Sequence, residues 1–110
     1  MTPDDLRAFG ADVDTGMARC MDNEAFYLKL VNSVKQEKKF DVLEESIAAG
    51  DLDAAFEAAH SLKGVLGNLS LTPLYEPVNE ITELLRGRTD TDYSVLLSQI
   101  AAKREEFLAL

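Results

Sequence analysis

The sequence is poor in residues that bind metals or form cross-links. It contains one cysteine, Cys20, and one histidine, His60, among 110 residues. A lone cysteine has no disulfide partner within the chain, and one cysteine with one histidine supplies too few ligands for a structural zinc site. We therefore expect neither a disulfide nor a bound metal. At 46% hydrophobic residues, the chain can bury a core without either.

Long apolar runs and positive charge are also scarce. No run approaches the roughly 20 apolar residues of a membrane-spanning helix, and the N-terminal residues MTPDDLRAFG lack the basic and apolar regions of a signal peptide. Twenty acidic and eleven basic residues leave a net charge of -9, which repels nucleic-acid phosphates and anionic lipid headgroups. Solubility alone also explains such a charge. We expect a cytoplasmic protein that binds neither nucleic acid nor membranes.

Alternating strand patterns and Asn-Gly hairpin turns are absent, whereas helix start and stop residues recur along the chain. Thr2 is placed to cap a short first helix with Pro3 in its first turn, and Gly10 is placed to end it. Residues 15–21 can add one or two turns before Asn23 offers a new cap. The sequence therefore predicts an all-α protein.

The segment 23–49 has no glycine or proline. A continuous helix of about 40 Å would either bend at 35–39 or fray into two helices, and we favour one long, bent helix. It carries two apolar stripes, which are Phe26, Leu30, Val31 and Val34, followed by Phe40, Leu43 and Ile47. Gly50 is expected to end this helix, and Asp51 is expected to cap the next one, which reaches about Leu69.

The next predicted helix has Thr72 as its cap, Pro73 in its first turn and Gly87 at its end. Its inward stripe is Leu74, Val78, Ile81 and Leu85. A final helix over 92–108 carries Val95, Leu96, Ile100 and Phe107. Short loops between helices favour antiparallel neighbours. We predict an antiparallel up-and-down four-helix bundle with a short extra N-terminal helix, forming a single domain over 1–110 with a lead-in at 1–22 and the bundle at 23–110.

The direction of His60 follows from the helix that carries it. At about 100° per residue, one narrow arc collects Ala55, Ala59, Leu62, Leu66 and Leu69. His60 lies roughly 140° from the centre of this stripe, and Gly64 lies nearly opposite the stripe. The histidine is therefore predicted to point to solvent. Exposed histidines are common, so this position alone is also compatible with an ordinary surface residue.

Two glycines follow His60 within the same helix. Each costs roughly 1 kcal/mol relative to alanine, so Gly64 and Gly67 together weaken the helix by up to about 2 kcal/mol. They remove side chains beside the imidazole, although close packing is an alternative explanation for Gly67. Lys63, three residues after the histidine, is near enough to reach a group attached to the ring. A nucleophilic nitrogen, a cation and open space are what phosphoryl transfer requires.

The stretch AAHSLKGVLGNL resembles the His-x-x-Lys-Gly signature of histidine phosphotransfer (HPt) domains, and the similarity continues from near Gly10 onward. The resemblance implies that His60 accepts a phosphoryl group on Nε2 and that Lys63 helps to neutralise it. It also implies that Gly64 keeps the ring accessible and that Gly67 occupies a small-residue position. Phe56 has two alternative roles. It belongs either to the apolar patch that docks receiver domains, or to the flank of the helix, where it is partly buried.

The resemblance also implies which partners the chain has. Receiver domains of response regulators or hybrid sensor kinases would exchange the phosphoryl group with a monomeric phosphocarrier that is not an enzyme. No cofactor is expected, since Mg²⁺ would belong to the receiver and the sequence has no nucleotide-binding loop. Some members orient the histidine with a polar residue on the following helix, and here Asn79 or Thr82 are the candidates.

Two other functions are compatible with the pattern. A helical adaptor would dock receiver domains without being phosphorylated, although Lys63 and Gly64 then have no purpose. A hydrolase would use His60 as a general base, and Glu57 lies three residues before it. However, helix-surface Glu and His pairs are ordinary, and no nucleophile accompanies this one.

Overall fold

The computed structural model describes all 110 residues and contains seven helices and no strand. The N-terminal part consists of α1 (Pro3–Phe9), α2 (Val13–Arg19) and α3 (Glu24–Val34). The rest consists of α4 (Lys39–Ala48), α5 (Leu52–Asn68), α6 (Thr72–Arg86) and α7 (Ser94–Leu108). The prediction of an all-α protein is confirmed. None of the helices has the length and hydrophobicity that crossing a membrane requires.

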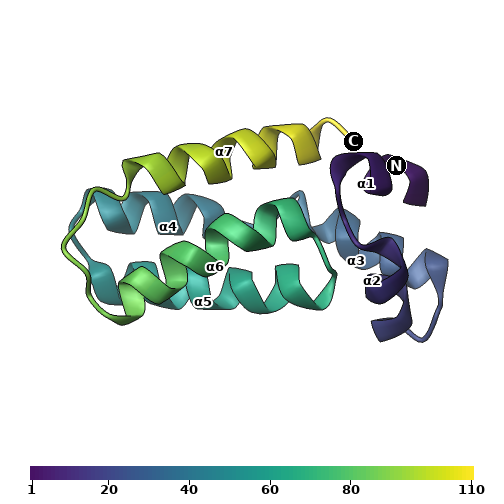
Figure 1. Ribbon diagram of the computed structural model, residues 1–110, viewed down its shortest axis with the longest axis horizontal. Coiled ribbons are helices and arrows are strands. Elements are labelled where there is room, and N and C mark those ends of the chain that lie inside the picture. Colours follow the sequence, from purple (N-terminus) through teal and green to yellow (C-terminus); the bar gives the residue numbers. More distant parts are fainter.

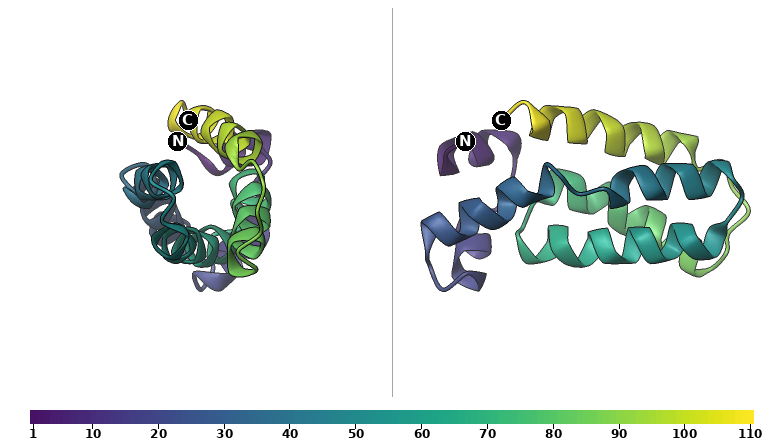
Figure 2. Two further views of the ribbon diagram at one scale, coloured as in Figure 1. Left: turned by 90° about the vertical axis from the view of Figure 1, so that its left-hand side faces the viewer. Right: turned by 180° about the vertical axis from the view of Figure 1, so that it is seen from behind.

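Helices α4 to α7 run lengthwise beside one another, whereas α1, α2 and α3 gather at one end of the molecule (Figure 1). Within the bundle, α5 packs against α4 and α6, and α7 packs against α6. The end-on view in Figure 2 shows the four helices grouped around a common axis. The molecule measures 41 × 24 × 19 Å. The four-helix bundle is confirmed, with α4 alone in the place of the helix expected over 23–49. The N-terminal part adds α1, then α2, which covers most of the turns expected at 15–21, and then α3.

The expected long helix over 23–49 is wrong, because α3 ends at Val34 and α4 begins at Lys39. In a continuous helix, Phe40 would lie about 180° from Val31, so the two apolar stripes would face opposite sides. The break lets Val31, Val34, Phe40 and Leu43 all be buried. The polar segment 35–38 between the stripes has no side chain buried in the core. Tertiary packing therefore does not hold this segment in a helix.

Four residues of the predicted apolar stripes are not buried in the core. Phe26 is 41% exposed, and its neighbour Tyr27 is fully buried instead, donating a hydrogen bond of 2.9 Å to the Leu69 carbonyl. Val95 is 61% exposed, because it lies about 100° around α7 from the buried Leu96. Leu30 and Ile47 are only partly buried. Every other residue of the predicted stripes from Leu74 to Phe107 is buried.

The predicted helix ends are mostly confirmed. The Thr2 hydroxyl accepts a hydrogen bond from the Asp5 amide, and the Asp5 carboxylate accepts one from the Thr2 amide. Gly10 ends α1 in the left-handed region with a φ of 110°. Thr72, however, is not a cap: it is the first residue of α6, and Leu71 precedes the helix. Leu71 is fully buried, so a hydrophobic residue occupies the position before this helix and no side chain caps it.

Candidate functional site

Helix α5 holds the histidine in a fixed direction. The helix begins where the Asp51 carboxylate accepts a hydrogen bond of 3.0 Å from the Ala54 amide. The predicted stripe is buried throughout, with Ala55, Ala59, Leu62, Leu66 and Leu69 all 3% exposed or less. His60 lies outside this stripe and is exposed, as its position on the helix predicts. The buried stripe thus prevents α5 from rotating and keeps the imidazole on the surface.

The two glycines after His60 have different environments. A Cβ atom added at Gly64 would meet nothing within 4 Å, so the surface beside the histidine is open there. A Cβ atom at Gly67 would lie 3.1 Å from the Tyr75 ring of α6. Of the two explanations for Gly67, close helix packing therefore has direct support. Close packing does not explain Gly64, because no atom packs against this position. What its missing side chain does is leave open surface beside His60.

An open groove begins at Gly64 and runs between α5 and α3. Its volume is about 580 Å³, and Glu37 is among the residues that line it. The walls include Leu30 and Val34 of α3 and Val65 of α5, so they are partly apolar. Because Gly64 is one turn from His60, a protein lying in this groove can come close to the imidazole.

The Lys63 ammonium is paired with a carboxylate of α6. Its Nζ lies 3.2 Å from Oε1 of Glu83, and Oε2 of the same carboxylate lies 3.2 Å from Nε of Arg86. The bonds from Lys63, and then from Arg86, lower the pKa of Glu83 below its ordinary value. The carboxylate therefore stays ionised at neutral pH. Two cations and one anion thus lie along the α6 side of the site.

The imidazole ring itself is in contact with an aromatic side chain. The rings of Phe56 and His60 are stacked, with centroids 5.5 Å apart and planes inclined by 28°. The Arg86 guanidinium lies over the Phe56 ring, 5.0 Å from its centroid. Phe56 is partly buried against the core. Partial burial at the helix flank, one of the two alternatives for Phe56, is therefore observed, and the ring is also stacked on the histidine.

Neither polar residue considered for orienting the ring contacts it. Thr82 is fully buried, and its hydroxyl donates a hydrogen bond of 2.6 Å to the Val78 carbonyl. Asn79 lies too far along α6 to reach His60. Lys63 is paired with Glu83, and Gly67 lies against Tyr75, so this alignment of α5 and α6 places Asn79 level with about Val65. No group of the chain donates a hydrogen bond to the imidazole or accepts one from it, and Glu57 is exposed without contacting it.

The sequence analysis missed three charged residues around the histidine. Glu83 and Arg86 lie on α6, and their approach to α5 depends on how the two helices are aligned. The third is Lys39 at the start of α4, whose Nζ donates a hydrogen bond of 2.7 Å to the Ser61 hydroxyl beside His60. The spacing of Glu83 and Arg86 puts them on one face of a helix, but no sequence signal relates that face to His60.

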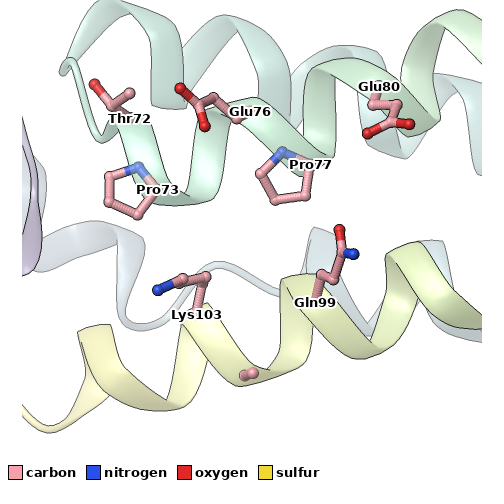
Figure 3. Close-up of a pocket in the computed structure, with 8 residues that line it drawn as sticks. Thr72, Pro73, Glu76, Pro77, Glu80, Gln99 and Lys103 are labelled. Atoms are coloured by element: carbon pink, nitrogen blue, oxygen red, sulfur yellow. The ribbon is translucent and has the colours of Figure 1, made fainter.

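Other features of the molecule lie apart from this site. A pocket of about 540 Å³ between α6 and α7 is lined by Pro73, Pro77, Gln99 and Lys103, with Glu76 and Glu80 at its edge (Figure 3). None of these residues contacts His60 or Lys63. No cluster of three or more histidine, cysteine or acidic side chains is arranged to bind a metal ion.

Comparison with known proteins connects this geometry to a family. The model described as "Hpt domain" matches residues 34–109, which is more than half of the chain. The match spans α4 to α7 and therefore contains His60, Lys63 and Gly64. No curated protein and no solved structure matches the chain.

Proposed function

The chain belongs to the Hpt domain family, and from this premise we propose that His60 is its phosphoacceptor. His60 takes a phosphoryl group from a receiver-domain aspartate, or from a kinase, and passes it to another receiver. Hpt domains are phosphocarrier modules of two-component signalling and do not act as ATP-binding catalysts. The observation that carries the proposal is an exposed imidazole on α5 with open surface at Gly64 and the Lys63 ammonium one turn away.

The reaction is a direct exchange between two side chains. The Nε2 lone pair of His60 attacks phosphorus, and the N–P bond forms while the P–O bond to the receiver aspartate breaks. The bonding electrons leave with the aspartate as a carboxylate. In-line attack needs free space on the side of the imidazole that meets the receiver, and the bare backbone at Gly64 provides it. Mg²⁺, which neutralises phosphoryl oxygens in such transfers, is expected in the receiver.

Lys63 is the cation of this chain for the transferred group. Before transfer its ammonium is paired with Glu83, and a dianionic phosphoryl group on His60 offers a stronger partner than one carboxylate. In this proposal, the Lys63 side chain rotates from Glu83, which is half exposed, to the phosphoryl oxygens. Glu83 keeps Arg86 as a partner after the exchange.

The proposal is tested by transfer from a receiver carrying labelled phosphate on its aspartate. Label should appear on the chain, survive alkali and be lost in acid, as phosphohistidine requires. His60→Gln is the matched variant and should remain unlabelled while binding the receiver. Failure of the unmodified chain to take label, or undiminished label on His60→Gln, refutes the proposal. Receiver binding without any label is the result that an adaptor would give.

A further inference from the structure

The orientation of the His60 ring needs a cause other than hydrogen bonding. No group of the chain bonds to the imidazole, and Thr82, on the helix that faces it, is bonded to its own backbone. An exposed side chain that is free to rotate about χ1 and χ2 spends only part of its time with Nε2 in the attacking direction. Whatever restricts this rotation raises the fraction of productive encounters.

Phe56 is in a position to provide that restriction. Helical side chains lean toward the N-terminus of their helix, so the His60 ring leans over the residue one turn earlier. That residue is Phe56, whose ring is stacked on the imidazole at 5.5 Å and 28°. Gly64, one turn on the other side, leaves the opposite approach open. The ring is thus supported on one side only.

Phe56 is itself held in place from two directions. It packs against the core, which limits its own rotation. The Arg86 guanidinium lies 5.0 Å from its centroid, and Glu83 holds this guanidinium through a bond of 3.2 Å. Because Glu83 also binds Lys63, the contacts form a chain from the imidazole to the phosphate-binding ammonium.

We propose that Phe56, backed by Arg86, is the positioning residue of the phosphoacceptor: its flat ring holds the His60 imidazole in the orientation from which Nε2 attacks. This inference rests on the proposed function. In this proposal, stacking of Phe56 on the His60 ring fixes the orientation that a hydrogen bond to the ring would otherwise fix. It differs from a docking role for Phe56, because a docking residue changes how tightly the receiver binds rather than how fast bound partners react.

The test compares Phe56→Leu, which keeps apolar volume but removes the flat ring, with Phe56→Tyr, which keeps the ring. Transfer from a labelled receiver is measured over a range of receiver concentrations. We expect Phe56→Leu to lower the maximal rate about two- to ten-fold, the range that an aromatic pair contributes, with the half-saturating concentration unchanged. Phe56→Tyr should restore the rate. Arg86→Met, which keeps Phe56 itself, should shift the maximal rate in the same direction by less.

NMR of His60 provides an independent readout. Its ring protons should be shifted by the ring current of Phe56 in the unmodified chain, and this shift should vanish in Phe56→Leu and persist in Phe56→Tyr. A raised half-saturating concentration with an unchanged maximal rate overturns the proposal and makes Phe56 a docking residue. Unchanged kinetics in Phe56→Leu also overturn it. If the unmodified chain never takes label, the proposed function fails instead, while the ring-current shift still reports the stacking.

Discussion

Substitution of Gly64 should stabilise the protein while impairing its function. The residue lies inside α5, and a Cβ atom there would meet nothing within 4 Å. Gly64→Ala therefore adds no steric strain and gains the helix preference of alanine, about 1 kcal/mol. For a domain of this size, that gain raises the melting temperature by about 4 °C. Thermal unfolding followed by circular dichroism measures the effect.

A larger side chain at the same position should block transfer. Gly64→Leu keeps a good helix former, so helicity should be retained. Its side chain occupies the open surface one turn from His60, where the receiver must approach. Displacement of reacting groups by about 1 Å costs on the order of 100-fold in rate. We expect a loss of that order in transfer of label from the receiver, with Gly64→Ala intermediate.

Gly67→Ala is the matched control for the stability argument. It lies on the same helix, but its Cβ atom would approach the Tyr75 ring to 3.1 Å, so the ring must shift. We expect a smaller gain in melting temperature than for Gly64→Ala, or a loss. If Gly64→Ala melts no higher than the unmodified chain, the position is not an open helix interior. If Gly64→Leu transfers at the normal rate, the reasoning about access to His60 is wrong.

Four further predictions concern other contacts. Gly16→Ala should destabilise the fold by about 1 to 3 kcal/mol, seen as a lower melting temperature, because its Cβ would lie 2.7 Å from the Leu69 carbonyl oxygen. Tyr27→Phe loses the hydrogen bond to that carbonyl and should cost about 1 to 2 kcal/mol in urea unfolding. Burial raises the pKa of Tyr27, so stability should fall as pH rises above about 10, and less steeply in Tyr27→Phe. Lys63→Ala should slow transfer by about tenfold with receiver affinity unchanged by calorimetry; a normal rate contradicts its role.

Much of α5 was predictable because the argument stays within one helix. The stripe from Ala55 to Leu69, the cap at Asp51 and the outward direction of His60 all follow from the regular turn of the helix. The prediction of a continuous helix was wrong at 35–38, because the apolar stripes before and after this segment must both be buried in the same core. A helix that continued through this segment would satisfy local preference and leave one stripe exposed. Burial of both stripes outweighs the few backbone hydrogen bonds lost at the break.

The surroundings of His60 were less predictable than its direction. Phe56 and Lys63 were predictable because they lie one turn from the histidine on the same helix. Glu83 and Arg86, which come from α6 and hold those two residues, were not. Thr82 was a candidate orienting group, and burial directs that hydroxyl to the backbone instead. Contacts within a helix were foreseen, and contacts between helices were not.

The sequence by itself determined the helical class, most helix ends, and an exposed His60 with Lys63 and Gly64 beside it. Only the tertiary structure decided that Glu83 binds Lys63, that Arg86 covers Phe56 and that Gly67 packs on Tyr75. The physical reason is that directions around one helix follow from its covalent geometry and regular hydrogen bonding. The alignment of two helices depends instead on how all their side chains fit together, which no local pattern records.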